Sequence, residues 1–162
     1  MTKTATPTAA RSFIALLALA CFAGGCGNSG GAAATSAGLP TVPMKIGSKT
    51  FTLEIANDAA EREKGLMRRD AMPADHGMIF VFPGEERLGF YMKNTRIPLD
   101  IIFLNANGVI VSIKQMRPYD VSTTYTDSPA KWAIELNQGQ AAAAGLNVGD
   151  QLSVPEAARN PE

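Results

Sequence analysis

Polar side chains that could bind a ligand are most concentrated in the segment from residue 93 to residue 100. The segment offers a cation, an amide, a hydroxyl and a carboxylate, at Lys93, Asn94, Thr95 and Asp100. Pro98 fixes its own φ and favours an extended conformation at the residue before it, so the connection is stiff. A stiff connection with these groups predicts a recognition surface for a sugar, a peptide terminus or an anion. The alternative is turn chemistry, in which Asn and Thr side chains bond their own backbone and the carboxylate pairs with a nearby cation.

Carboxylates on otherwise apolar segments form a second candidate group: Glu54, Asp100 and Glu135. We expect Glu135 to belong with the ligand-binding residues of the first group. Two carboxylates across a cleft would instead permit acid–base hydrolysis, as in glycosidases, and this alternative requires Asp100 and Glu135 to face one another. A carboxylate on the solvent side of a strand, or in an ion pair, would have no such role. Sequence spacing leaves these alternatives open.

Methionines and the single histidine give a third possibility. Four of these residues are candidate ligands for copper: Met67, His76, Met78 and Met92. Thioether and imidazole ligands suit Cu(I), and the segment after residue 26 has no cysteine to compete with them. The same methionines occupy positions where apolar core residues are expected, and methionine is a common core filler. The main expectation is therefore no cofactor, with copper as the alternative.

Charge and cysteine content exclude several classes of protein. After residue 25 the chain carries 13 basic and 15 acidic residues, and this balance gives no electrostatic basis for nucleic acid binding. Both cysteines, Cys21 and Cys26, precede residue 27. The remainder of the chain therefore has no disulfide framework, no thiolate metal site and no cysteine nucleophile. A Ser-His-Asp triad would require His76, and no nucleophile-elbow motif accompanies it.

The first 25 residues are typical of a bacterial lipoprotein signal peptide. Lys3 and Arg11 precede an apolar run of ten residues, 13–22, which is too short to span a bilayer. The run ends in Ala23-Gly24-Gly25-Cys26, which resembles a lipobox and predicts acylation of Cys26. We expect an exported protein held in the membrane by this lipid and, in a Gram-negative host, directed to the outer membrane facing the periplasm.

The rest of the chain is predicted to form one domain. Residues 26–41 are small and uncharged and read as a lipid-anchored tether, residues 42–154 as a single β-rich domain, and residues 155–162 as a tail. Strands are predicted at 42–46, 49–56, 78–82, 88–92, 99–104, 109–114, 131–136 and 151–154. Short helices are predicted from residue 58 to about 67, with Asp58 and Glu61 at capping-box spacing, and over 140–144. This pattern predicts a mainly β (α+β) fold, a compact antiparallel barrel or sandwich with two short helices.

Several motifs together resemble a known family. They are Glu61-Arg62 with Gly65-Leu66-Met67, Gly77 to Phe80, Phe90 to Thr95, Ile97 to Phe103, and Glu135-Leu136 with Gly139. Their order resembles that of domain-of-unknown-function family 192, a bacterial and archaeal group, over residues 49–152. The resemblance implies a small β-rich fold that is often exported, and it implies no activity.

The main interpretation is an envelope-anchored, non-catalytic accessory domain that binds a small ligand or an envelope protein. Its recognition residues would be Lys93, Asn94, Thr95, Asp100 and Glu135. A periplasmic hydrolase with paired carboxylates and a Met/His copper protein remain the alternatives, so catalysis is left open.

Overall fold

The computed structural model describes residues 38–160. The predictions for the signal peptide, for acylation of Cys26 and for most of the tether lie outside the described residues. Eight strands and three short helices follow in chain order: β1 (Thr41–Ile46), β2 (Lys49–Ala56), α1 (Ala59–Lys64), β3 (His76–Glu86), β4 (Gly89–Phe90), β5 (Leu99–Leu104), β6 (Ile110–Met116), β7 (Thr124–Tyr125), β8 (Ala130–Asn137), α2 (Gln140–Ala143) and the 3₁₀ turn η1 (Glu156–Ala158).

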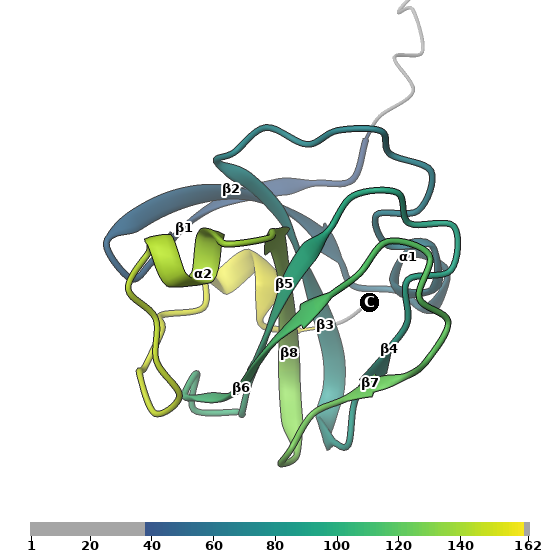
Figure 1. The fold of residues 1–162 in the computed structure, drawn as a ribbon. Coiled ribbons are helices and arrows are strands. Elements are labelled where there is room, and N and C mark those ends of the chain that lie inside the picture. Colours follow the sequence, from purple (N-terminus) through teal and green to yellow (C-terminus); the bar gives the residue numbers. More distant parts are fainter. Residues whose placement is uncertain (1–37, 161–162) are drawn as a thin grey trace, which may run out of the picture. The chain divides into compact units, whose positions relative to one another are not determined.

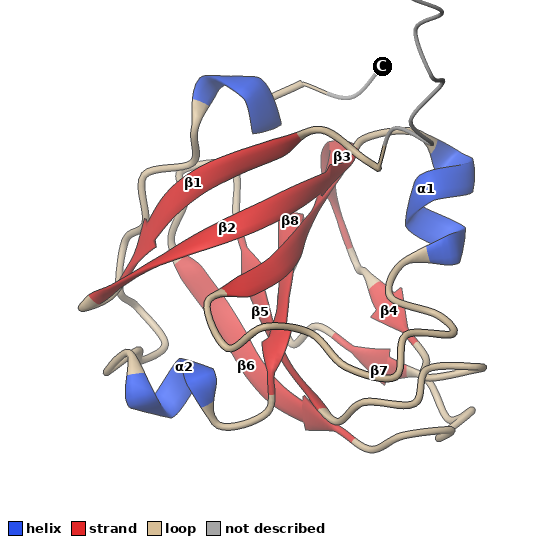
Figure 2. Cartoon of the chain, turned by 90° about the horizontal axis from the view of Figure 1, so that it is seen from above, coloured by secondary structure: helices blue, strands red, loops and turns tan. Residues whose placement is uncertain are grey.

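Six of the strands form one mixed sheet in the order β1-β2-β3-β8-β5-β6, and β4 and β7 form a small second sheet. The strands of the large sheet cross the middle of the domain in Figure 2. All neighbours in it are antiparallel except β2 and β3, which are parallel. A parallel neighbour needs a crossover connection, and α1 with the loop after it provides one.

Each face of the large sheet carries its own apolar cluster. Ile79, Ile134 and Ile102 lie opposite one another on β3, β8 and β5 and pack into the first cluster with α2 and η1. Phe80, Ala133 and Phe103 are the next set across these strands and pack into the second cluster. Because both faces are covered, all six residues of β5 are buried, and its sequence shows a continuous apolar run rather than alternation.

The helices lie on opposite sides of this sheet. In Figure 1, α2 and the 3₁₀ turn lie to one side of the β3, β8 and β5 strands, and α1, β4 and β7 lie to the other. Helix α1 begins with the predicted capping box: the Asp58 side chain accepts from the Glu61 amide, and the Glu61 carboxylate accepts from the Asp58 amide. No helix among residues 38–160 combines the length and the apolar content needed to cross a bilayer.

The predicted fold class is confirmed as mainly β with two short α-helices, and the sheet is mixed rather than wholly antiparallel. The predicted strand over 151–154 is wrong. Only a single bridge joins Gln151 to Val109, because the chain leaves the sheet there toward the 3₁₀ turn. Helix α1 also ends three residues earlier than predicted, since Gly65 has φ 46° and turns the chain away from the helix axis.

Candidate functional site

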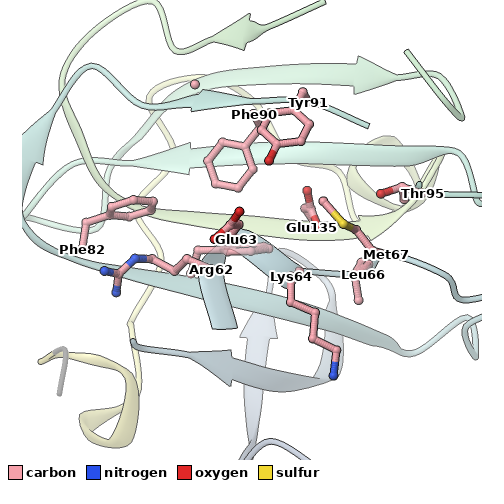
Figure 3. A pocket seen from close by; sticks show the side chains of 13 residues that line it. Arg62, Glu63, Lys64, Leu66, Met67, Phe82, Phe90, Tyr91, Thr95 and Glu135 are labelled. Atoms are coloured by element: carbon pink, nitrogen blue, oxygen red, sulfur yellow. The ribbon is translucent and has the colours of Figure 1, made fainter. Parts of the chain in front are cut away.

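A pocket of about 280 Å³ opens on the α1 side of the large sheet. It is lined by Arg62, Glu63, Lys64, Gly65, Leu66, Met67, Phe80, Phe82, Gly89, Phe90, Tyr91, Thr95 and Glu135 (Figure 3). These residues come from α1 and the turn after it, from β3 and β8 of the sheet, and from β4 and the loop that follows. Ligand pockets are usually roughly 300 Å³ or more, so this one suits a small molecule.

Glu135 lies in the sheet beneath this pocket. It is a residue of β8, with Met78 of β3 and Ile101 of β5 directly opposite it on the neighbouring strands. Glu135 is 5% exposed. Among the hydrogen bonds of residues 38–160, none involves its carboxyl group. A buried carboxyl that faces a pocket without a partner has a desolvation cost that only a ligand or water can offset.

Burial raises the pKa of Glu135 to about 8, and the positive charge of Arg69 opposes this shift. Burial has the larger effect. Arg69 also pairs with another carboxylate, since its Nη2 donates to Glu54 Oε2 at 2.7 Å. Glu135 is therefore mainly protonated at neutral pH and ionises only slightly above it. Such a group can donate a hydrogen bond to a neutral ligand or become the counterion of a cationic one.

Aromatic rings form the walls of the pocket. The Phe90 ring packs edge to face against Phe80, Phe82 and Phe103, with ring centroids 5.0, 6.3 and 5.7 Å apart. Tyr91 follows directly and is 41% exposed, so it lies at the opening. These contacts hold Phe90 rigidly over the pocket, and ring faces held in this way attract both apolar groups and cations.

The rim from α1 carries three charged residues with different orientations. Arg62 Nη1 donates to the carbonyl oxygens of Asn57 and Val81 at 2.7 and 2.9 Å, and its guanidinium lies over Phe82. In Figure 3 the ammonium group of Lys64 points away from the pocket, whereas the Glu63 carboxylate turns toward the space before Phe90. The interior is therefore faced by two carboxyl groups, those of Glu63 and Glu135, whereas Arg62 is bonded to the backbone and the Lys64 ammonium is directed outward.

The predicted ligand-binding residues do not form one site: two line the pocket, two line a groove, and Asp100 lies elsewhere. Thr95 and Glu135 both line the pocket, and Thr95 is buried. Lys93 and Asn94 instead line an adjoining open groove of about 450 Å³. Asn94 has φ 58°, and its carbonyl accepts from the Arg68 amide at 2.8 Å, which ties this segment to the chain after α1.

Asp100 lies on the opposite face of the sheet from Glu135. In the register of β5 and β8, Asp100 is opposite Leu136, whereas Ile101 is opposite Glu135, so the two carboxyl groups project to different sides. Asp100 Oδ2 accepts from the Ala141 amide at the start of α2 at 2.9 Å. The paired-carboxylate arrangement required for the hydrolase alternative is therefore absent between these two residues.

The four copper candidates are also divided. His76 begins β3 with its side chain 41% exposed, and its Nδ1 lies 2.8 Å from Asp75 Oδ1. Met78 and Met92 are buried in the second apolar cluster, and Met67 lines the pocket. Within residues 38–160 there is no group of three or more His, Cys, Asp or Glu side chains arranged to hold a metal ion.

Sequence reasoning missed the aromatic walls and Glu63 as site residues. Phe90 and Tyr91 belong to the family motif, but nothing in the sequence signals that they face Glu135. Four of the segments that carry the family resemblance meet at this pocket: 61–67, 77–80, 90–95 and 135–136. This convergence is visible only once the strand pairing is known.

Comparison with known proteins gives consistent results. The model of the DUF192 family, described as an uncharacterized ACR, matches residues 42–154. A UPF0127 protein of Pyrococcus furiosus is 31% identical over 111 residues, which cover 64% of this chain and 89% of that protein.

Two crystal structures have a similar fold. One is a protein of unknown function from Novosphingobium aromaticivorans, with TM-score 0.66 and 34% identity, covering 72% of this chain and 86% of the other. The second is described as a putative transcription regulator from Sinorhizobium meliloti, with TM-score 0.65 and 34% identity, covering 70% of this chain and 91% of the other.

Proposed function

The chain belongs to the DUF192 family of uncharacterized proteins, and from this premise we propose that it is a non-catalytic module that binds a small organic cation in the Glu135 pocket. The observation that carries the proposal is the buried Glu135 carboxyl, which lacks a protein partner within residues 38–160 and faces a pocket with aromatic walls. A carboxylate beneath aromatic rings is an arrangement that recognises ammonium groups.

The charges around the pocket favour a cation over an anion. Glu63 and Glu135 face the space, the Arg62 guanidinium is bonded to two backbone carbonyls, and the Lys64 ammonium points outward. An anion would meet two carboxyl groups, and the unengaged Lys64 ammonium is directed away from it. A cation would gain a counterion at Glu135 and contact the ring faces of Phe90 and Tyr91.

Catalysis is not part of the proposal because the carboxyl pair that the hydrolase alternative requires, Asp100 and Glu135, does not meet. Asp100 projects from the other face of the sheet, and Glu63 lies at the exposed rim. One buried carboxyl among aromatic rings supports binding, whereas glycoside hydrolysis needs two that flank one bond.

The predicted location of the module remains part of the proposal. The lipobox-like sequence at Cys26 supports an exported, membrane-anchored lipoprotein, placed at the outer membrane and facing the periplasm in a Gram-negative host. The family match begins at residue 42, after the predicted tether. An accessory role near the membrane surface, in which the module captures a ligand for an envelope protein, is consistent with this arrangement.

The proposal is tested by isothermal titration of the purified protein with choline, a permanent cation, between pH 6 and 9. Because the cation binds the ionised form of Glu135, its affinity should rise about tenfold per pH unit up to pH 8 and then level off. At pH 7 binding should release close to one proton, measurable by comparing buffers with different ionisation enthalpies.

Two matched variants complete this test. Glu135→Gln keeps the shape of the side chain and should abolish both the binding and its pH dependence. Asp100→Asn makes the same change at the other buried carboxyl and should leave both intact. Choline binding that is independent of pH, or that survives Glu135→Gln, would contradict the assignment of the pocket, and absence of binding would refute cation recognition.

A further inference from the structure

A basic groove continues outward from the Glu135 pocket. The groove of about 450 Å³ is lined by Ala60, Glu63, Lys64, Met67, Arg68, Tyr91, Lys93 and Asn94. Four of these residues, Glu63, Lys64, Met67 and Tyr91, also line the pocket, so the two spaces adjoin. A ligand in the pocket can therefore extend into the groove.

The groove is lined by more cations than carboxylates, whereas the carboxyl groups of Glu63 and Glu135 face the interior of the pocket. Lys64, Arg68 and Lys93 line the groove, against the single carboxylate of Glu63. Within residues 38–160 no salt bridge or side-chain hydrogen bond engages any of these three cations, although five salt bridges form elsewhere. Three unengaged cations at one depression attract a phosphate or carboxylate group.

The backbone holds the cations of two distant segments together. The Arg68 amide donates to the Asn94 carbonyl at 2.8 Å, and the Thr95 amide donates to Met92 at 3.0 Å. Lys93 therefore lies on a fixed turn against the chain that follows α1. The Asn94 side chain, at the edge of the groove, adds an amide donor for an anionic oxygen.

We propose that the groove is an anion subsite for the ligand of the Glu135 pocket, and that this ligand is bipolar, with an ammonium group in the pocket and a phosphate or carboxylate group in the groove. The inference rests on the proposed function, because it requires an ammonium group to bind first beside Glu135. It adds the second charge of the ligand and the residues that recognise it, Arg68 and Lys93.

The test compares choline with phosphocholine, which share the trimethylammonium group and differ in the phosphate. At low salt and pH 8, phosphocholine should bind at least about tenfold more tightly than choline, and added salt should reduce this advantage. The double variant Arg68→Gln Lys93→Gln should remove the advantage of phosphocholine and leave choline binding unchanged. The control Lys45→Gln Lys131→Gln removes two cations outside both spaces and should preserve the advantage.

Equal affinities for the two probes, or an advantage that survives Arg68→Gln Lys93→Gln, would overturn the anion subsite while leaving the cation pocket intact. Failure of choline and phosphocholine to bind would overturn the proposed function and the bipolar ligand with it.

The same ligand chemistry occurs in a soluble molecule and in a lipid headgroup. Phosphatidylcholine vesicles and free glycerophosphocholine carry the same headgroup and distinguish these sources. Displacement of bound phosphocholine by the vesicles identifies a headgroup that is reachable in a bilayer. Displacement by glycerophosphocholine alone identifies a soluble ligand.

Discussion

Each face of the large sheet buries one carboxyl group, and the two groups have different surroundings. Asp100 is 2% exposed on the α2 face, where Oδ2 accepts from the Ala141 amide, although Oδ1 has no partner within residues 38–160. Glu135 is 5% exposed on the α1 face, where its carboxyl has no protein partner in the described part of the chain and a pocket lies beside it. The two carboxyl groups are therefore buried to a similar extent, but Asp100 has a hydrogen-bond donor and Glu135 has none in the described part of the chain.

The covering of each face explains this difference. On the α2 face, alanines of the short helix and of the 3₁₀ turn pack closely against the sheet and close the first cluster. On the α1 face no residue of α1 is buried, so the helix stands off the sheet and leaves a space that aromatic rings only partly fill. A buried polar group inside a closed cluster serves the fold, whereas one beside an open space is available to a ligand.

The largest effect that this comparison predicts is on stability above pH 8. The unfolded chain ionises Glu135 near pH 4.5, whereas the folded chain keeps it protonated to about pH 8. Stability from this group is therefore fully present below pH 4.5 and is lost as the pH rises through 8. Glu135→Gln removes this penalty, and at pH 9 it should be more stable than the wild type by about 5 kcal/mol. Urea denaturation at pH 5 and pH 9 measures the difference.

At pH 5 the two proteins should differ by less than about 1 kcal/mol, since this pH is only about half a unit above the pKa of Glu135 in the unfolded chain. Asp100→Asn serves as the control and should show no comparable gain at pH 9. A constant difference between wild type and Glu135→Gln across this pH range would show that the Glu135 carboxyl is not buried in solution.

A smaller loss is expected when the bonded carboxyl is removed. Asp100→Ala leaves the buried Ala141 amide without an acceptor and should destabilise the protein by about 2 kcal/mol. Asp100→Asn retains a side-chain oxygen for that amide and should cost less than half as much. Neither change should alter choline affinity, because Asp100 faces away from the pocket. Equal losses in the asparagine and alanine variants would contradict this account. They would show that Asp100 stabilises the protein through its charge and not as a hydrogen-bond acceptor.

Much of the fold follows from the sequence because local chemistry determines it. Alternation in residues 49–56 predicts β2, and Asp58 with Glu61 predicts the start of α1 through the capping box. The strand pair 99–104 and 110–116 follows from the turn residues Asn105 to Gly108. The strand predicted at 151–154 failed because hydrophobic alternation there reflects packing against the first cluster, through Leu152 and Val154, rather than strand pairing.

The site was predictable only in part, for a physical reason. The polar segment 93–100 identifies Thr95, a carboxylate on an apolar segment identifies Glu135, and both residues line the pocket. However, β5 and β8 are covered on both faces, so the alternation that would assign Asp100 and Glu135 to a face is lost. The walls depend on Phe90, which belongs to a two-residue strand whose position is set by long-range contacts.

The smallest effect concerns the charge pair beside Glu135. The Arg69 guanidinium lowers the pKa of Glu135, but burial has the larger effect in the opposite direction. Arg69→Gln should therefore move the rise of choline affinity to higher pH. This move should be smaller than the upward shift that burial causes in the pKa of Glu135. Glu54→Gln frees the guanidinium from its carboxylate partner and should move the rise to lower pH. Shifts in opposite directions would establish that charge acts on Glu135, since loosening of the pocket would move both variants in the same direction. No cation pairs with Asp100 among the described residues. A neighbouring guanidinium that tunes a buried carboxyl is therefore a feature of the α1 face.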